Sequence, residues 1–165
     1  MAESYGTEAA ADIYHSDRGN TNWAGFTSAQ KLEGLLVASE YIDQQYRSSF
    51  PGWKVGDRSQ VREWPRFDAY DQSNDLIPSN AVPVEVERAV YEAALIHLDG
   101  TALLTDFTAG TDIREVSVDG AVSVKFAGSN NPDDAQTHFA NVAAAIAAVL
   151  KLGTGGSNFG RFEPG

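Results

Sequence analysis

The sequence predicts a mainly α fold of the α+β class: a small helical bundle of about three to four helices, a β-hairpin and an extended terminal arm. Apolar residues recur at helical spacing in three segments. An Asp-Gly dipeptide separates two alternating apolar runs at about 113–126. The C-terminal residues are rich in glycine. At 165 residues the chain has the length of one domain, which we place at 1–152, followed by an arm at 153–165.

The N-terminal segment 1–26 shows little periodicity. Ala9 to Ala11 fit at most a short helical turn. The string SDRGNTNW predicts turn and loop, because Gly19 and Asn20 disfavour regular structure.

The first long helix is predicted to begin at Thr27 or Ser28, either of which is a good N-cap, and to run to about Arg47. Its charged residues, Asp43 among them, fall mostly off the apolar stripe, and Phe50-Pro51-Gly52 ends the helix. The predicted stripe consists of Leu32, Leu35, Leu36, Ser39, Ile42 and Tyr46.

A long connection, 51–82, follows this helix. Pro51, Pro65 and Pro78, together with several Gly, Asp, Asn and Ser residues, exclude a long regular element. A connection of this length inside a compact domain is uncommon and is usually functional or bound to a partner.

Two further helices and a hairpin complete the prediction. One helix opens with VPVEVERAVYEAALIHL: Pro83 fits its first position, and Glu85 and Glu87 lie in its first turn, where the helix dipole favours acids. The other runs from about Asp134 to Leu150, and Asp119-Gly120 between them is a hairpin turn. The inner face of the first of these helices consists of Val86, Val90, Ala93, Ala94 and His97.

The composition disfavours a protein that wraps nucleic acid. Twelve Lys and Arg residues against 23 Asp and Glu give a net charge of −11, whereas such proteins usually carry a basic balance or face. An acidic surface lets DNA pass without lingering. The chain has no cysteine, no apolar run of membrane-spanning length and no signal-peptide pattern, so we expect a soluble, cytoplasmic protein without a membrane partner.

No residue pattern predicts an enzyme, a cofactor or a metal site. The motifs of hydrolases, zinc proteases and nucleotide-binding loops are missing from the sequence. We expect His97 to pack in the core, and His15 and His138 to lie at the surface or in local hydrogen bonds. Three aspartates, Asp68, Asp71 and Asp75, have the spacing of a metal loop but lack the glycine and glutamate of an EF-hand.

The stretch FPGWKVGDRSQVREWPR, residues 50–66, allows two interpretations. Trp53 and Trp64 with nearby basic residues could form a groove in which the bases of a single strand stack. Alternatively, the stretch is a packed and salt-bridged loop with another role. The basic residues are Lys54, Arg58, Arg62 and Arg66, and Asp57 and Glu63 offset half of their charge.

Five motifs, taken in order, resemble a family of phage and prophage proteins over roughly residues 14–100. Its members often carry the label of DnaT-like single-stranded DNA-binding proteins, yet they look like head-to-tail adaptors of tailed double-stranded DNA phages. The motifs are YHSDRGNTNW (14–23), ASEYIDQQY (38–46), FPG (50–52), QVREWPR (60–66) and IPSNAVPVEVERAVYEAAL (77–95).

The resemblance implies a virion structural protein rather than an enzyme. Adaptors of this kind assemble beneath the portal as a ring, commonly of twelve copies, in the neck of a virion that is put together in the host cytoplasm. The implied partners are the portal protein, neighbouring adaptor subunits, a tail, nozzle or stopper protein, and double-stranded DNA that passes through the channel without sequence-specific binding. The alternative is a single-stranded DNA-binding protein that uses residues 50–67.

Under the adaptor interpretation we expect two groups of residues to bind the portal or a neighbouring subunit. Basic side chains of the connection would face acids of the next subunit and set the register of the ring. A Gly-rich arm becomes ordered when a partner holds it, and its aromatic and arginine residues are the natural anchors. The expected partner-binding residues are Trp53, Arg58, Arg62, Trp64 and Arg66, and in the arm Phe159, Arg161 and Phe162.

Overall fold

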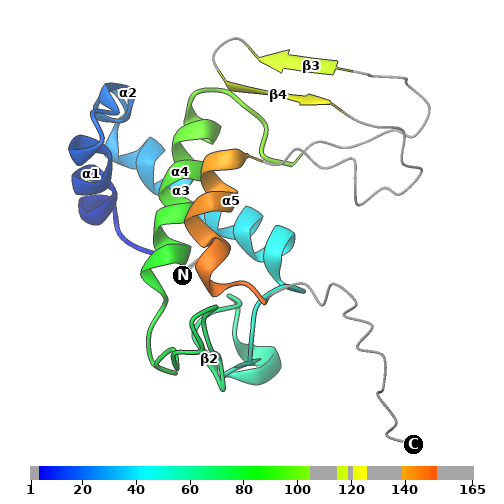
Figure 1. Ribbon diagram of the computed structural model, residues 1–165. Coiled ribbons are helices and arrows are strands. Elements are labelled where there is room, and N and C mark those ends of the chain that lie inside the picture. The colour runs from blue at the N-terminus through cyan, green and yellow to red at the C-terminus, as the bar shows by residue number, and fades with distance from the viewer. Residues whose placement is uncertain (1–3, 105–114, 119–120, 126–138, 152–165) are drawn as a thin grey trace, which may run out of the picture.

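The computed structural model describes residues 4–104, 115–118, 121–125 and 139–151 (Figure 1). Within these residues the fold is mainly α with a small antiparallel β component, which confirms the predicted class. The helices are α1 (Glu8–Asp17), α2 (Thr21–Ala24), α3 (Ser28–Tyr46), α4 (Val84–Leu98) and α5 (Ala140–Ile146). The strands are β1 (Trp53–Lys54), β2 (Arg66–Phe67), β3 (Glu115–Val118) and β4 (Ala121–Lys125), with 3-10 turns η1 (Asp57–Ser59) and η3 (Ala147–Val149).

The N-terminal segment contains two helices where the sequence predicts at most a short helical turn, but the turn predicted at Gly19 and Asn20 is present between them. The hydroxyl of Thr7 caps α1 by accepting a hydrogen bond from the amide of Ala10 at 3.2 Å. Only Ala11 and His15 of α1 are buried, and α2 is a single turn around buried Trp23. Helices with so narrow a buried face leave little apolar periodicity in the sequence.

Helix α3 begins and ends close to where the sequence predicts. Thr27 and Gln30 form a reciprocal capping box: the Thr27 amide donates to the Gln30 side chain, and the Gln30 amide donates to the Thr27 hydroxyl. Leu32, predicted to be buried, is exposed, whereas Lys31 and Asp43, predicted to lie off the stripe, are buried. The N-terminal segment and the 51–82 connection both pack on α3: Asp12 contacts Lys31, and Tyr5 and Arg62 contact Asp43.

The other two helices depart from prediction at their starts. Pro83 is the N-cap of α4 rather than its first residue, and its carbonyl accepts from the amide of Val86. Glu85 and Glu87 do lie in the first turn, as predicted. Phe139, the N-cap of α5, has an extended backbone, and the predicted start of that helix near Asp134 lies outside the described residues.

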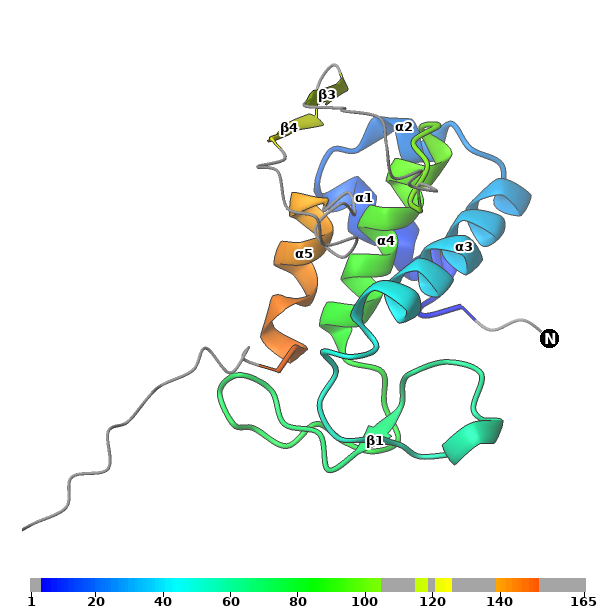
Figure 2. The same cartoon turned by 90° about the vertical axis from the view of Figure 1, so that its right-hand side faces the viewer.

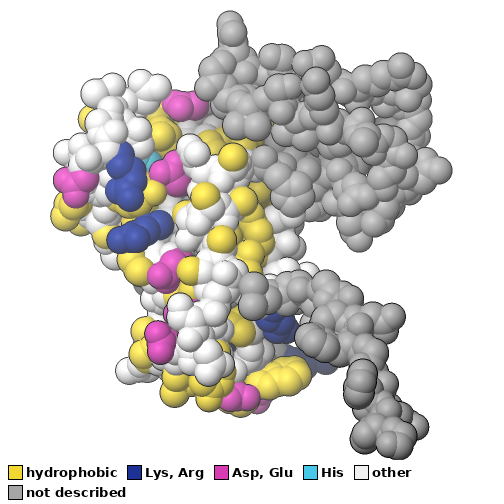
Figure 3. All heavy atoms as spheres, in the orientation of Figure 1, with side chains coloured by type: hydrophobic (Ala, Val, Ile, Leu, Met, Phe, Trp, Pro, Cys, Tyr) yellow, Lys and Arg dark blue, Asp and Glu magenta, His cyan; other side chains and the backbone are white. Residues whose placement is uncertain are grey.

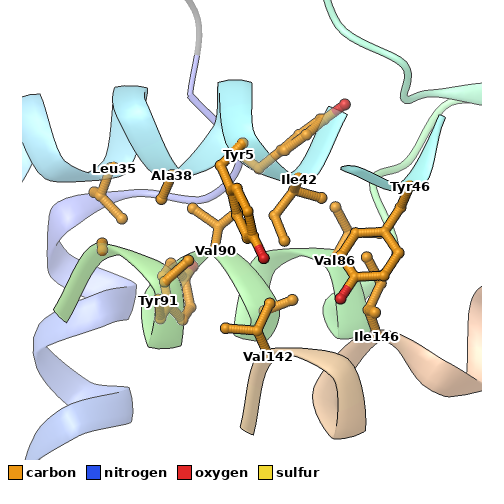
Figure 4. Packing of buried hydrophobic residues seen from close by; sticks show 14 of the residues in the cluster. Tyr5, Leu35, Ala38, Ile42, Tyr46, Val86, Val90, Tyr91, Val142 and Ile146 are labelled. Atoms are coloured by element: carbon orange, nitrogen blue, oxygen red, sulfur yellow. The ribbon is translucent and has the colours of Figure 1, made fainter. Parts of the chain in front are cut away.

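The hydrophobic core lies where α3, α4 and α5 meet (Figure 4). Leu35, Ala38 and Ile42 of α3 face Val86 and Val90 of α4, and α5 adds Val142 and Ile146 from the other side. Full burial of one such aliphatic side chain stabilises a fold by about 1.5–3 kcal/mol. Gly34 lets α3 approach α4 closely, because a Cβ there would lie 3.0 Å from the Leu98 side chain.

The predicted hairpin is present as an antiparallel pair of strands. Glu115 of β3 pairs with Lys125 of β4, and Val116 pairs with Val124. Its Asp119-Gly120 turn lies outside the described residues, as do His138 and the arm residues Phe159, Arg161 and Phe162.

His15 is a core residue, which corrects the expected surface position, whereas the alternative expectation of a local hydrogen bond is met by its contact with Asn20. It is fully buried, and its ring centroid lies 4.4 Å from that of Trp23. Its Nε2–H donates to the carbonyl of Tyr91 at 3.2 Å, and Nδ1 accepts from the Asn20 side-chain amide at 3.0 Å. A neutral imidazole satisfies both bonds, and burial lowers the pKa of His15. His97, expected in the core, is only half-buried.

We predict that acid destabilises the protein through His15. The unfolded chain binds a proton at this histidine more readily than the folded one, so stability is fully present above the ordinary pKa of 6.5. As the pH falls from 6.5 to the lowered pKa of folded His15, this contribution to the free energy of unfolding is lost. Between these two pKa values the loss is about 1.4 kcal/mol per pH unit. Urea unfolding at about pH 7.5 and about pH 5 measures the loss.

The matched variant is Asn20→Asp, which keeps the shape of the side chain and places a carboxylate next to Nδ1. This carboxylate favours the imidazolium and therefore raises the pKa of His15. The variant should lose less stability than the wild type between the two pH values. Equal losses in both proteins would exclude His15 as the source.

Candidate interaction surface on the 51–82 loop

The connection 51–82 forms a folded loop at one end of the helical bundle, below α3, α4 and α5 in Figures 1 and 2. It contains β1, β2 and η1, and an isolated bridge joins Tyr70 to Leu76. Its base is tied to the end of the bundle: the Gln72 amide donates to the carbonyl of Ala148, and the Lys151 amide donates to that of Ser49. The loop is therefore part of the domain.

The extended chain of the loop alternates in burial with a period of two residues. Arg62, Trp64 and Arg66 point inward and are 6%, 2% and 7% exposed, whereas Val61 and Phe67 point outward and are 77% and 46% exposed. Alternation is what an extended backbone imposes. This placement is unusual, because charged residues are normally exposed and apolar residues normally buried. Here two arginines, Arg62 and Arg66, are buried, whereas Val61 and Phe67 are exposed.

A buried carboxylate, Asp43 of α3, holds the inward side of the loop. Its Oδ1 accepts from the Tyr5 hydroxyl at 2.5 Å and from the Glu63 amide at 3.3 Å, and its Oδ2 accepts from Arg62 at 3.4 Å. The Tyr5 hydroxyl in turn accepts from the amide of Trp64 at 3.0 Å. Asp43 thus joins the N-terminal segment, α3 and the loop.

The pKa values at this site reflect the cost of burying charge. Burial raises the pKa of Asp43, against the opposing effect of the donors from Tyr5, Glu63 and Arg62. Burial and the neighbouring Asp43 carboxylate also raise the pKa of Tyr5. The carboxylate therefore depends on its donors, and loss of any one leaves a buried charge under-compensated.

Arg66 forms the second anchor of the loop. Its Nε donates to the carbonyl of Pro51 at 2.6 Å, Nη2 to that of Gly52 at 2.8 Å, and Nη1 to the Glu63 carboxylate at 2.9 Å. The planar guanidinium serves three directions at once, which a lysine cannot do. Gly52 has φ +62°, and a Cβ there would overlap the carbonyl oxygen of Phe67, so this turn requires glycine.

The outward side of the loop is an apolar surface. Trp53 of β1 lies opposite Phe67 of β2 in register, so the two share one face of the ribbon. Val55 continues this face, and Tyr70 and Leu76 pair across the isolated bridge. Figure 3 shows hydrophobic side chains gathered along the lower end of the molecule. We name the six exposed residues Trp53, Val55, Val61, Phe67, Tyr70 and Leu76 the apolar loop face.

Charged groups border the apolar loop face at η1. A shallow hollow of about 370 Å³ is lined by Trp53, Lys54, Asp57, Arg58, Glu63 and Arg66. Lys54 lies 3.9 Å from Glu63, and Arg66 is held by its own hydrogen bonds. Arg58 is exposed, and within the described part of the chain no ion pair engages it. It is the cation of this stretch that a partner can reach most directly.

The structure divides the expected partner-binding residues of the loop into two sets. Trp53 and Arg58 are exposed on the outer side, whereas Arg62, Trp64 and Arg66 are buried against their own chain. The basic residues therefore do not line one groove with both tryptophans. Arg62 instead faces Asp43 and, at 3.9 Å, Glu40 of α3 in the same chain.

Sequence reasoning missed two kinds of residue. Asp43 and Tyr5 were not expected to anchor the loop, because the helical pattern places Asp43 off the stripe. Val55 and Val61 were not expected to form a surface with Trp53, because residues 61–67, VREWPRF, show no regular alternation of apolar and charged residues.

No group of three or more His, Cys, Asp or Glu side chains in the described ranges is placed to hold a metal ion. None of the helices in that part of the chain has the length and apolarity needed to cross a membrane. Exposed apolar residues with a charged border make the apolar loop face the candidate surface for binding another macromolecule.

The fold and this surface define a small, mainly helical protein that presents an outward apolar loop. The chain belongs to a family described as "Putative DnaT-like ssDNA binding protein", which it matches over residues 1–162. No curated protein and no solved structure matches it significantly. The match therefore extends beyond the described residues as far as residue 162.

We predict that Asp43 and Arg62 stabilise the fold as a coupled pair. Asp43→Asn and Arg62→Met should each lower the free energy of unfolding by about 3–5 kcal/mol, because each removes an ionic contact of a buried charge. The double variant should lose clearly less than the sum, since it leaves neither charge. Chemical denaturation of the four proteins measures this coupling.

Glu40→Gln is the matched control. Glu40 also lies near Arg62, but its side chain is 55% exposed and 3.9 Å away. Its loss should cost less than about 1 kcal/mol. Additive losses for Asp43→Asn and Arg62→Met, or a cost at Glu40 as large as at Asp43, would contradict this account of the anchor.

Proposed function

We propose that the chain is a virion structural protein: a head-to-tail adaptor that forms a ring beneath the portal of a tailed phage. In this role it extends the DNA channel and presents a docking surface to the next tail component, such as a nozzle or stopper protein. Assembly is the activity, so no catalytic residue and no cofactor takes part.

The apolar loop face is the observation that carries this proposal. Six large apolar side chains lie exposed on one loop, and two of them, Trp53 and Val61, are 67% and 77% exposed. The loop is held rigidly from inside by Asp43 and Arg66, so its outer side is presented in one shape. A preorganised apolar surface suits stable association with protein, because little ordering remains to be done on binding.

The charge of the chain supports a channel protein. With a net charge of −11, the ring as a whole repels the phosphate backbone. Double-stranded DNA can then move through it without lingering. A protein that stored or wrapped DNA would need the opposite balance.

The arm 153–165 is proposed to reach the portal through Phe159, Arg161 and Phe162. The last described residue before it, Lys151, is bonded to Ser49 at the base of the 51–82 loop. The arm therefore leaves the domain at the end that carries the apolar loop face. Both binding elements would then serve the same end of the ring.

Single-stranded DNA binding is the second candidate, and it is the activity that the family description names. The observation in its favour is the exposure of Trp53 beside Arg58, since base stacking on one aromatic contributes about 1–3 kcal/mol. Against it, Arg62, Trp64 and Arg66 are buried and engaged within the chain. Only part of the 50–67 stretch is left to contact a strand.

The test is binding to purified portal rings, followed by native mass spectrometry or cryo-EM. We predict that the full-length protein forms a stoichiometric ring and that a truncation before Gly153 is not recruited. Val61→Ser should be recruited but give incomplete rings, because it weakens the apolar loop face and leaves the arm intact.

Leu104→Ser is the control for Val61→Ser, because it removes an exposed apolar residue outside the loop. It should form complete rings. If the full-length protein does not bind portal rings but binds single-stranded DNA in a salt-dependent manner that Trp53→Ala or Arg58→Ala abolishes, the adaptor proposal is wrong and the second candidate is right.

A further inference from the structure

The arm begins beside one part of the apolar loop face. Lys151, the last described residue before the arm, donates its amide to the carbonyl of Ser49 at 2.8 Å, just before the loop. Gln72 of the loop reaches the same end of the bundle, because its backbone amide and its side-chain amide donate to two carbonyls of η3. Figures 1 and 2 show the end of α5 directly above the loop. The start of the arm and Gln72 therefore lie close together.

Gln72 belongs to a short closed turn with an apolar residue at each end. Tyr70 and Leu76 pair across the isolated bridge, and inside it the Asp71 amide donates to the carbonyl of Asp75 at 3.0 Å. We name this segment the 70–76 turn. Its two apolar residues, Tyr70 and Leu76, are 43% and 62% exposed. The hydrogen bonds of Gln72 to η3 hold the turn at the end of the molecule from which the arm leaves.

The surroundings of this turn are acidic. Residues 68–78 contain three aspartates and no cation. Asp71 uses Oδ1 to accept from the amides of Ser73 and Asp75, and within the described part of the chain no ion pair engages either aspartate of the turn. A segment that covers the turn should therefore combine apolar side chains with a cation.

The arm has this composition and the length to return to the turn. Phe159, Arg161 and Phe162 fall within four residues, and Arg161 is the only cation of the arm. Phe159 is the eighth residue after Lys151, and eight residues span up to about 26–29 Å. Three of the first five residues of the arm are glycine, a composition that permits the chain to reverse its direction.

Tethering favours the chain's own arm as the occupant of the turn. A segment joined to its target by a short linker meets it at an effective concentration in the millimolar range, so even a weak contact forms. The arm of another copy has no such advantage, and it must approach a chain that carries the same net charge of −11.

We propose that in the free protein the arm folds back onto the loop of its own chain. Phe159 and Phe162 pack on the two apolar residues of the 70–76 turn, and Arg161 approaches its carboxylates. The apolar loop face is then incomplete in the free protein, which keeps copies apart. Portal binding uses the same arm residues and releases the turn, so only copies on the portal present the whole face. This release rests on the proposed function, whereas the fold-back itself does not.

The chain has no cysteine, so disulfide trapping reports the fold-back directly. In the full-length protein, Ser73→Cys places a thiol in the 70–76 turn, and Gly160→Cys places one between the aromatic residues of the arm. Neither change removes a residue of the proposed contact. After mild oxidation of a dilute sample, intact mass spectrometry and non-reducing electrophoresis measure the intramolecular disulfide. We expect its yield to exceed that of the control pair several-fold.

The control pair is Ser48→Cys with Gly160→Cys. Ser48 is exposed and precedes Ser49, the residue to which Lys151 is bonded, so an undocked arm reaches it as readily as it reaches Ser73. Adding Leu76→Ser to the Ser73→Cys pair should lower its yield to the control level. Leu104→Ser, which changes an exposed apolar residue outside the loop, should leave the yield unchanged.

Two results would overturn the fold-back. Equal yields of intramolecular disulfide from the Ser73→Cys and Ser48→Cys pairs would show that the arm does not prefer the turn. Disulfide-linked dimers as the main product of the Ser73→Cys pair would place the arm on a second copy.

The trapping result is independent of the portal experiment. Selective trapping without portal binding would keep the fold-back and refute the adaptor function. Portal rings formed by a protein that shows no selective trapping would keep the function and refute the fold-back. Where both hold, the oxidised Ser73→Cys/Gly160→Cys protein should not join portal rings until its disulfide is reduced. Recruitment of the oxidised protein would refute the release step.

Discussion

The described structure depends on one buried carboxylate. Asp43 lies inside α3 and accepts hydrogen bonds from Tyr5, from Arg62 and from the amide of Glu63. These donors come from separate parts of the chain, so the N-terminal segment, the longest helix and the loop meet at a single group. A buried ion pair adds little net stability compared with an apolar contact, but it permits only one arrangement of the loop. The contribution of Asp43 to this fold is therefore to fix the position of the loop relative to α3.

In that arrangement two arginines of the loop are buried and two of its apolar residues are exposed. Arg62 and Arg66 find acceptors within the chain, and the alternation of the extended backbone then forces Val61 and Phe67 outward. A sequence that looks like a basic and aromatic groove therefore folds with Arg62, Trp64 and Arg66 inside, and its exposed side carries apolar residues and Arg58.

Much of the fold could be predicted from the sequence, and the reasons for the failures are specific. The Thr27 cap, the α3 and α4 helices and the hairpin strands follow from local signals that act over a few residues. The helices α1 and α2 were missed because their buried faces are too narrow to produce periodicity. The roles of Asp43 and His15 were missed because each depends on partners, Arg62 and Tyr91, that are distant in the sequence.

The accessibility of the three tryptophans tests the central claim that the loop hides its charges and presents its apolar side to a protein partner. Trp23 and Trp64 are each 2% exposed, whereas Trp53 is 67% exposed. Acrylamide quenching of the free protein should detect one accessible tryptophan, which Trp53→Phe removes, and assembly on portal rings should protect it. Accessible Trp64 in the free protein, or Trp53 that stays fully accessible in the assembled ring, would contradict the account.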